Sequence, residues 1–409
     1  MNDKQLYAKI LGIEVPWSVT NVGLRLEQGE LEVNVEIDRA GLRCPQCGKP
    51  CPRHDSRPRR WRHLDTCQYR TILCADVPRV DCTEHGVHQV IVPWAEPRSG
   101  FTALFEALVI DWLKEASLSA VARLMNLSQD QVSGIMERAV ERGLERRKLE
   151  LPEVVSVDET SFQKRHEYVT VVSDPTRRQV LHVADDRTSE ALSSFWQAFP
   201  AERLARIRAV AMDMCAPYVN STVRYVPDAA AKIAFDKFHV AKLLADAVDR
   251  VRRTEHKELT SKGDRRLAKS RYLWLEGALV MSDERWSAFE RLRNSTLRTA
   301  RAYAIKETAM SLWNPRLGEE LEHEWRQWYG WAIRSRLEPM KKAARTVKRH
   351  LGGILNAIRL NITNAGAESI NAAIQKVKRM AHGFRNRDRF RNAIYFHLGG
   401  LDLYPKSQC

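Results

Sequence analysis

A series of short apolar runs that end in acidic residues constrains the fold of this chain most. Between residues 151 and 240, β-like runs alternate with helical segments, and the runs are VVSVDE, HEYVTVVSD, RQVLHVAD, IRAVAMDM and AAKIAFDKFHV, with a helix near 188–206. The first three runs can pair as a meander, and the later two can join the sheet through helical crossovers. The segment therefore predicts an α/β layer with carboxylates at the ends of its strands.

Two aspartates of this layer are candidate metal ligands. Asp158 ends the first run and Asp213 ends the fourth. A third acid is expected from a helix packed alongside, and Glu368 in TNAGAESINAAIQKVKRMAHGF fits that position. Three carboxylates suit Mg²⁺ or Mn²⁺, and two such ions about 4 Å apart can catalyse phosphoryl transfer. Taken singly, acids at strand ends are also ordinary caps and turn residues.

The helix that carries Glu368 is predicted to be amphipathic. Asn364, Gln375 and Arg379 share the face of Glu368, whereas the apolar residues Ile370, Ile374 and Val377 lie opposite. The helix would bury its apolar stripe and present Glu368 to a cleft. In the strand, alternation points Glu159 away from Asp158.

Six of the eight cysteines lie between Cys44 and Cys82. Cys44 and Cys47 form a CxxC knuckle, and Cys82 and His85 form a CxxH pair, so together they can bind one zinc ion tetrahedrally. The alternative is a set of buried free thiols. If the pairing is different, the substitute ligands are Cys51, His54 and His88.

Two further patterns surround this cluster. Residues 22 to 37 alternate apolar and polar residues on either side of Gln28-Gly29, which predicts a β-hairpin. The run RPRRWRH is basic and contains an aromatic residue, so it would suit a DNA phosphate; its candidate DNA contacts are Arg59, Arg60 and Arg62.

From Ser99 the spacing becomes helical and predicts a helix-turn-helix. Val121, Leu124 and Met125 would pack the first helix, Asn126-Leu127 would form the turn, and Ser128 would cap the second helix. In the second helix the inward residues are Val132, Ile135 and Met136, and the candidate base contacts are Gln129, Gln131 and Ser133. A plain helical hairpin is the alternative.

The formal net charge of +15 indicates a polyanionic partner such as nucleic acid, with a solvated basic surface as the alternative. Most of the excess lies between Arg334 and Arg391, where fifteen Lys or Arg face three acids, a surplus of 15 − 3 = +12. Such a local surplus is typical of a surface that binds a phosphate backbone. The candidate contacts in this segment are Lys376, Lys378, Arg379 and Arg385.

The chain between His239 and about residue 350 is predicted to be almost wholly helical. Its tryptophans from Trp274 to Trp331 include Trp325, Trp328 and Trp331 at helical spacing, which favours a core role over base stacking. The predicted domains are a β-hairpin and zinc module, a helix-turn-helix, the first part of an α/β core, an all-helical segment, and the last part of the core: 1–98, 99–150, 151–240, 241–360 and 361–409. No membrane span or signal peptide is expected, and the chain should be cytoplasmic.

The order of these motifs resembles the DDE transposases of bacterial insertion sequences, specifically the ISL-three group. The resemblance covers nearly the whole chain and is carried by VDETSF, RAVAMDM, FDKFHVAKLLADAVDRVRR and TNAGAESINAAIQKVKRMAHGFRN. It implies a multidomain α+β protein whose RNase H-like catalytic fold is interrupted by an all-α insertion. It also implies that Asp158, Asp213 and Glu368 are the DDE residues.

The resemblance assigns a positioning role to Asp236 and His239, which match a D-x-x-H pattern; core packing and helix capping are the alternatives. The run Cys82-Thr-Glu-His85 departs from the family, whose members commonly carry a second CxxC there, so the fourth zinc ligand stays open.

The implied activity is that of a transposase that binds terminal inverted repeats and catalyses metal-dependent DNA cleavage and strand transfer. It would use two Mg²⁺ or Mn²⁺ ions and one structural Zn²⁺, and act as a dimer or larger assembly on DNA. Two other classes share these residues: a structure-selective nuclease of RNase H-like fold, and a catalytically inactive DNA-binding regulator.

Overall fold

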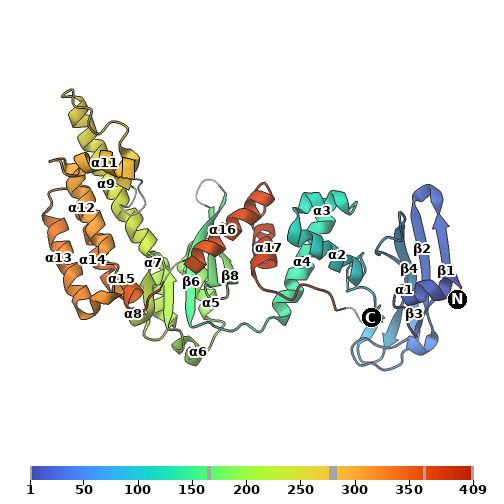
Figure 1. The fold of residues 1–409 in the computed structure, drawn as a ribbon. Coiled ribbons are helices and arrows are strands. Elements are labelled where there is room, and N and C mark those ends of the chain that lie inside the picture. Colours follow the sequence, from blue (N-terminus) through green and yellow to red (C-terminus); the bar gives the residue numbers. More distant parts are fainter. Residues whose placement is uncertain (1, 164–166, 276–282, 363–364, 407–409) are drawn as a thin grey trace. The chain divides into compact units, whose positions relative to one another are not determined.

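The computed structural model describes residues 2–163, 167–275, 283–362 and 365–406 (Figure 1). The chain divides into two compact units. The first contains Met1–Lys148 and Lys378–Cys409, and the second contains Leu149–Val377. None of the described helices is long and apolar enough to cross a membrane.

The first unit begins with helix α1 (Asp3–Ile10) and a sheet in the order β1-β2-β4-β3, with β5 paired to β4. Its strands are β1 Trp17–Arg25, β2 Glu30–Ile37, β3 Arg53–Arg62, β4 Arg70–Cys82 and β5 Gly86–Gln89. The predicted hairpin is confirmed, since β1 and β2 pair antiparallel and Gly29 closes their connection at φ 63°. Trp17 and Trp61 both pack edge-on against Trp94 in the core of this sheet.

The predicted helix-turn-helix forms from α2 (Ala103–Glu115), α3 (Leu118–Leu124) and α4 (Gln129–Arg146). Ser128 caps α4 in a capping box with Gln131, and Asn126 makes the turn at φ 51°. Val121, Val132, Ile135 and Met136 are buried as predicted. The prediction for Leu124 is wrong: its side chain is 62% exposed, because it is the last residue of α3 and Val121 and Ala122 supply the buried face.

Backbone hydrogen bonds join the β-sheet of the first unit to the helix-turn-helix. Arg62, the last residue of β3, donates from its N to the carbonyl of Gly100 and accepts from the N of Thr102. His63 Nδ1 lies 2.9 Å from Thr102 Oγ1, and burial lowers the pKa of His63 to about 4, so this imidazole stays neutral at pH 7. The sheet and the helices thus share one continuous hydrogen-bonded connection.

The C-terminal helix α17 (Arg387–Leu398) packs against α4, and the tail that follows covers the helix-turn-helix. Arg142 of α4 is buried, pairs with Glu106 at 3.2 Å, and donates to the carbonyl of Leu403. Arg146 donates to Asp402 at 3.0 Å. Gly143 permits the close approach, since an added Cβ would meet Leu401.

The second unit contains a sheet in the order β10-β9-β6-β7-β8. Its strands are β6 Val154–Gln163, β7 Glu167–Asp174, β8 Gln179–Asp185, β9 Ala209–Met212 and β10 Ile233–Phe235. The predicted meander is confirmed, because β6, β7 and β8 pair antiparallel. The predicted crossovers are confirmed too, because β9 joins β6 and β10 joins β9 in parallel.

Helices connect these parallel strands. α5 (Ser189–Trp196) and α6 (Ala201–Ala205) replace the single helix predicted near 188–206, with Pro200 at the start of the second. α7 (Ala216–Tyr225) and α8 (Ala229–Lys232) lie between β9 and β10.

The described residues between His239 and about residue 350 are mostly helical, as predicted, and further helices follow. The helices are α9 Lys237–Thr260, α10 Arg271–Leu275, α11 Asp283–Arg293, α12 Arg298–Ser311, α13 Leu321–Arg334, α14 Glu338–Arg349, α15 Leu351–Arg359 and α16 Ala365–Met380. Trp274, Trp325 and Trp328 are buried in a core shared with the sheet. Trp331 is not a core residue: it is 38% exposed, because α13 buries the face of Leu321, Trp325, Trp328 and Ala332.

Glu255 of α9 caps the neighbouring helix α12. Its buried carboxylate accepts from the N of Arg298 and the N of Thr299, both at 2.7 Å, and from Thr299 Oγ1 at 2.6 Å. The residue at the cap position itself, Leu297, offers no side-chain hydrogen bond. A long-range contact thus satisfies the start of α12.

We expect Glu255→Ala to destabilise the second unit by about 2 kcal/mol, because it leaves buried donors unsatisfied at a helix N-terminus. The measurement is the midpoint of urea unfolding followed by tryptophan fluorescence. Glu258→Ala is the matched control, since Glu258 pairs with the same Arg298 from an exposed position. Equal shifts for the two variants would contradict the capping role.

Candidate active site and metal centre

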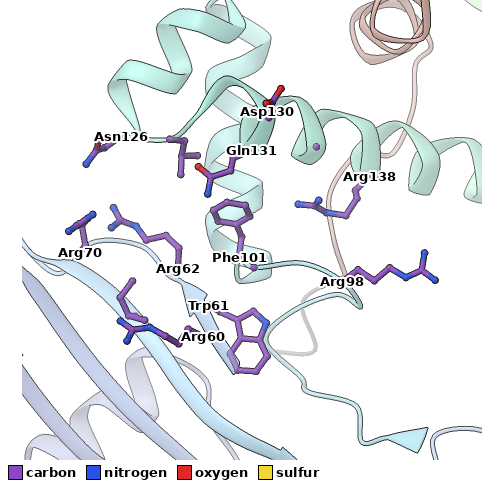
Figure 2. Close-up of a pocket in the computed structure, with 14 residues that line it drawn as sticks. Arg60, Trp61, Arg62, Arg70, Arg98, Phe101, Asn126, Asp130, Gln131 and Arg138 are labelled. Atoms are coloured by element: carbon purple, nitrogen blue, oxygen red, sulfur yellow. The ribbon is translucent and has the colours of Figure 1, made fainter. Parts of the chain in front are cut away.

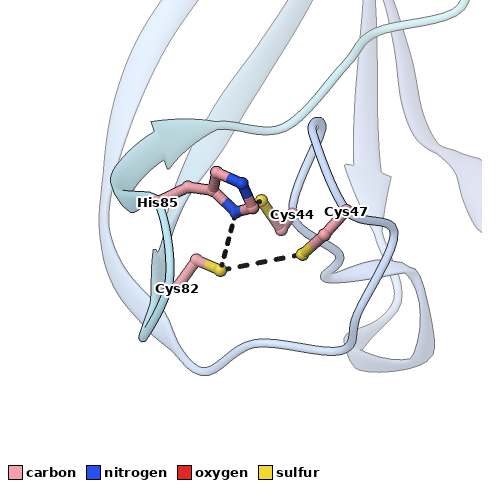
Figure 3. Close-up of side chains that lie close together, drawn as sticks. All are labelled: Cys44, Cys47, Cys82 and His85. Atoms are coloured by element: carbon pink, nitrogen blue, oxygen red, sulfur yellow. Dashed lines mark hydrogen bonds between the residues drawn. The ribbon is translucent and has the colours of Figure 1, made fainter.

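Cys44, Cys47, Cys82 and His85 gather at one end of the first sheet (Figure 3). The CxxC knuckle lies in the loop between β2 and β3, while Cys82 ends β4 and His85 lies in the turn before β5. Their four ligand atoms lie within 4.8 Å of one another. Distances between them include 3.8 Å from Cys47 Sγ to Cys82 Sγ and 3.6 Å from Cys82 Sγ to His85 Nδ1. A tetrahedral zinc site with Zn–S bonds of about 2.3 Å has edges of about 3.8 Å, so the geometry fits zinc.

The chemistry of the cluster fits zinc as well. Hydrogen bonds from the backbone at Glu84 and from the side chain of His85 lower the pKa of Cys82 to about 6, which favours the thiolate that a metal requires. The predicted substitutes lie outside this group. Cys51 donates to the carbonyl of Lys49, His54 lies 3.6 Å from Asp55, and His88 lies 2.7 Å from the carbonyl of His85.

A cleft of about 530 Å³ lies in the first unit beside the start of α4 (Figure 2). Arg60, Arg62 and Gln131, three predicted DNA contacts, line it. Arg60 also pairs with Glu30 and Glu32, and Arg62 with Asp65, so part of their charge is neutralised within the protein. The cleft contains three arginines that the sequence analysis missed, because they come from separate elements: Arg70, Arg98 and Arg138.

The other candidates of this unit lie outside the cleft lining. Arg59 lies over the ring of Trp61 at 5.7 Å. Gln129 is exposed and Ser133 is half-buried on α4.

Gln131, which lines the cleft, accepts a hydrogen bond from the N of Ser128 through its Oε1. The capping box therefore fixes the side chain that was predicted to contact bases.

The parallel register of the second sheet brings Asp158 and Asp213 level. Ser156 of β6 pairs with Ala211 of β9, so two residues later Asp158 and Asp213 occupy equivalent positions. Met212 pairs with Phe235 of β10, so the next residue, Asp236, continues the row. Three aspartates thus follow one another across adjacent strands. Asp213 and Asp236 come directly after β9 and β10, as expected for Asp213. The prediction that Asp158 ends its strand is wrong, because β6 continues to Gln163 and keeps pairing with β7.

Asp158 is held on both of its oxygens. Oδ1 accepts from the N of Glu159 at 2.7 Å, and Oδ2 accepts from Asn371 Nδ2 at 2.5 Å. Burial raises the pKa of Asp158, and the negative charge of Asp213 adds to the rise. The site therefore favours a neighbouring cation, which would keep this buried carboxylate ionised.

Asp213 is held in the same way. Oδ1 accepts from the N of Cys215 at 3.0 Å, and Oδ2 accepts from Arg187 Nη2 at 2.6 Å. Arg187 Nε also lies 2.5 Å from Glu159 Oε2. Glu159 and Asp213 thus share Arg187, whereas the side chain of Asp158 contacts Asn371. Arg187 was missed by the sequence analysis, because it lies in a short connection with no motif of its own.

Asp236 and His239 lie beside this row at the start of α9. Asp236 Oδ1 accepts from the N of Phe238 at 3.0 Å, and its Oδ2 lies 3.1 Å from His239 Nδ1. The hydrogen bond to Asp236 raises the pKa of His239, and the charges of Asp213 and Asp158 contribute to the rise. The pair therefore both caps α9 and places a protonatable ring near the acids.

Helix α16 carries Glu368 and packs along β6. Ile370, Ile374 and Val377 are buried as predicted. Besides Asn371, Gln375 contacts β6 by donating to Thr160 Oγ1 at 2.9 Å. Glu368 is exposed, one turn before Asn371. Within the described residues, its carboxylate does not form a group as tight as the cysteine cluster with Asp158 and Asp213.

The remaining candidates are the other residue predicted on the face of Glu368 and the basic residues predicted to contact DNA. Asn364 lies outside the described residues. Lys376, Arg379 and Arg385 are exposed, whereas Lys378 is half-buried and burial lowers its pKa.

Three family models match this chain in the order in which its modules occur. A zinc-finger model of the transposases of IS204, IS1001, IS1096 and IS1165 matches residues 41–85, and a helix-turn-helix model of transposase family ISL3 matches residues 90–140. The transposase model of the ISL3 DDE family matches residues 155–394. These ranges contain the metal cluster, the capped helix pair and the row of acids.

Relatives of known identity agree with the models. The chain is 28% identical to the transposase of insertion sequence IS1001 from Bordetella parapertussis over 85% of its own length and 86% of the relative's. It is 28% identical to the transposase of IS1557 from Mycobacterium tuberculosis over 84% of its own length and 83% of the relative's. The fold modules and the matches together define a DNA-binding transposase. The chain belongs to the ISL3 family of insertion-sequence transposases.

We expect purified protein to contain about one zinc per chain. Cys44→Ser with Cys47→Ser should remove it and unfold the loop between β2 and β3, because metal binding and local folding are coupled. Elemental analysis of a preparation made without chelators measures the content. Cys67→Ser is the control, since Cys67 is an exposed thiol outside the cluster. Zinc retained in the double variant would refute the assigned ligands.

Gly366 fixes the position of α16 on the second unit. An added Cβ would overlap the carbonyl oxygen of Pro175, in the turn after β7. We therefore expect Gly366→Ala to displace the helix that carries Glu368 and Asn371, and to lower DNA cleavage at least about tenfold. Gly352→Ala is the control, because nothing lies within 4 Å of its added Cβ. Equal activity of the two variants would show that the contact does not position α16.

Proposed function

We propose that the chain is an RNase H-like DDE transposase that cleaves DNA at the ends of its element and joins those ends to target DNA. Asp158, Asp213 and Glu368 are its metal-binding acids. The observation that carries the proposal is the parallel register of β6 and β9, which brings Asp158, within β6, level with Asp213, directly after β9. The sheet order, a three-stranded meander extended by two parallel strands, supports the RNase H-like assignment.

The site fits two Mg²⁺ or Mn²⁺ ions by its donor set. Carboxylate oxygens are the ligands that these ions prefer, and the raised pKa of Asp158 reflects a charge that a cation would stabilise. When bound, the ions would activate a nucleophile and stabilise a leaving oxygen in an in-line displacement at phosphorus. The protein's own contribution is orientation: Asn371 holds Asp158, and the N of Cys215 holds Asp213.

The two reactions share this site. In the first, a water oxygen forms a bond to phosphorus, the bond to the 3′ oxygen of the element end breaks, and the proton leaves to solvent or to His239. In the second, the freed 3′-OH attacks a target phosphodiester and displaces another 3′ oxygen. One set of acids can serve both reactions because each is a displacement at a phosphodiester.

Recognition of the element ends is assigned to the first unit. The zinc module (1–98) and the helix-turn-helix (99–150) would bind the terminal inverted repeats, with α4 in the major groove. The basic candidates Lys376, Lys378, Arg379 and Arg385 would add sequence-independent phosphate contacts. The catalytic core would comprise 151–240 and 361–409, and the helices of 241–360 would form an insertion.

Both element ends must be held during transposition, so we propose a dimer or larger assembly on DNA in the bacterial cytoplasm, associated with the nucleoid. Asp236 and His239 would position the acids and the attacking group. The zinc ion would have a structural role only.

The test replaces each acid in turn. We expect Asp158→Ala, Asp213→Ala and Glu368→Ala each to lower end cleavage and strand transfer by about 10³-fold or more, because each removes charge stabilisation of the transition state. DNA binding should be unchanged, since the acids do not contribute to the basic interface. Double variants should be hardly worse than single ones. Labelled element ends, target plasmid and Mg²⁺ or Mn²⁺ provide the assay.

Glu153→Ala is the control variant, since Glu153 is an acid of the same unit whose side chain is 81% exposed. Full cleavage by any single variant would remove that acid from the site, and cleavage in excess EDTA would exclude the metal mechanism. Cleavage without joining by the unmodified protein would favour a structure-selective nuclease. Binding without either reaction would favour an inactive regulator.

A further inference from the structure

Arg187 bridges two acids at the candidate active site, Asp213 and Glu159. Its Nη2 donates to Asp213 Oδ2 at 2.6 Å, and its Nε lies 2.5 Å from Glu159 Oε2. The guanidinium fork suits two carboxylates at once. Its side chain is 40% exposed, so the bridge forms at the surface of the site and can exchange.

The backbone of Arg187 is held in place by its neighbours. Asp186 donates from its N to the carbonyl of Tyr168, and its own carbonyl accepts from Thr170 Oγ1 at 2.6 Å. Thr188 caps α5 through the N of Ala191. Because both flanking residues are bonded to regular elements, Arg187 can change its side-chain partner without moving its backbone.

The oxygen that Arg187 occupies is the one that a metal ion would need. Asp213 Oδ1 accepts a hydrogen bond from the backbone N of Cys215. Oδ2 is therefore the oxygen of this carboxylate whose partner can be replaced. Asp158 is held by the N of Glu159 and by the neutral amide of Asn371. Arg187 is thus a cation bound directly to Asp213, and a divalent ion at this carboxylate would repel it.

Glu159 remains as an anchor for the guanidinium. Its Oε2 lies 2.5 Å from Arg187 Nε, on the opposite arm of the guanidinium from the one that Asp213 holds. A guanidinium released by Asp213 would therefore stay at the rim of the site, where a DNA phosphate must lie.

We propose that Arg187 is an exchangeable counter-cation of Asp213. In the metal-free enzyme it neutralises this carboxylate. When a divalent ion binds, Arg187 releases Asp213 and contacts a DNA phosphate, while Glu159 keeps its contact with the guanidinium. This inference rests on the proposed function, since it requires the metal site at Asp158 and Asp213. It explains why an Asp-Glu pair, and not a single acid, lies in β6: the first acid binds metal and the second anchors the arginine.

The first experiment measures Mn²⁺ affinity of the zinc-loaded, full-length protein by electron paramagnetic resonance. Arg187→Gln and Arg187→Met should each bind Mn²⁺ about three- to tenfold more tightly than the unmodified protein, because a repelling charge is removed. Arg187→Lys should bind as the unmodified protein does. A structural defect would weaken binding, so tightening is a specific result.

Arg177→Gln is the matched control, because Arg177 of the same unit pairs with Glu150 at 3.2 Å and lies 4.0 Å from Asp174, away from the row of acids. Its Mn²⁺ affinity should be unchanged. Asp158→Ala should lose the binding signal. If it does not, the proposed metal site fails; if it does and Arg187→Gln binds Mn²⁺ no more tightly, only the role of Arg187 fails.

The second experiment measures affinity for a duplex that carries the element end, in EDTA and in Ca²⁺. Arg187→Gln should match the unmodified protein within about twofold in EDTA, where Asp213 holds the guanidinium. In Ca²⁺ it should bind several-fold more weakly, because the phosphate contact is missing. A deficit already present in EDTA, or none in Ca²⁺, would overturn the proposed exchange.

Discussion

Electrostatic repulsion among carboxylates at one end of a sheet is the constraint on which the second unit depends. The parallel register brings Asp158, Asp213 and Asp236 level, and Glu159 lies next to the first. Each acid is balanced by a different element: Asn371 from α16, Arg187 from the β8–α5 connection and His239 from α9. The helices around the sheet and the connections between them therefore both cover its core and supply donors to these carboxylates.

These donors differ in what they can do when a metal ion arrives. The amide of Asn371 is neutral and can remain on Asp158, and the backbone N of Cys215 cannot leave Asp213. His239 is bonded to Asp236, one strand away. Arg187 alone among these contacts adds a full positive charge to Asp213, so metal loading acts most strongly on this contact.

The first unit depends on two other features: the predicted zinc site, and the backbone hydrogen bonds that join the sheet to the helix-turn-helix. The predicted zinc ion would join the loop before β3 to the turn after β4. The end of β3 is bonded to the helix-turn-helix through the backbone of Arg62, Gly100 and Thr102. The zinc ion and these hydrogen bonds would thus act at opposite ends of the same strand. This arrangement suits a surface that must hold one register on DNA.

Most of the fold of this chain was predictable from local patterns. The alternation around Gln28-Gly29, the five runs between 151 and 240, and the capped helix at Ser128 all formed, because period and capping are local properties. Leu124 and Trp331 were wrongly predicted to be buried, because helical spacing alone does not show which end of an apolar stripe packs against another element. For the candidate zinc site, the CxxC and CxxH pairs indicated the four residues that the structure brings together, because paired cysteine and histidine spacing of this kind is typical of zinc sites.

The sequence by itself determined which residues are candidates for the two sites: two aspartates in neighbouring strand segments, a glutamate on an amphipathic helix, and two cysteine-containing pairs. Only the tertiary structure decided which donor meets each acid, since Asn371 lies far along the chain from Asp158, and Arg187 has no motif around it. The physical reason is that hydrogen bonds and ion pairs between distant elements depend on register and helix placement. Those are set by packing of the whole unit, as at Gly366 against Pro175, and not by any local pattern.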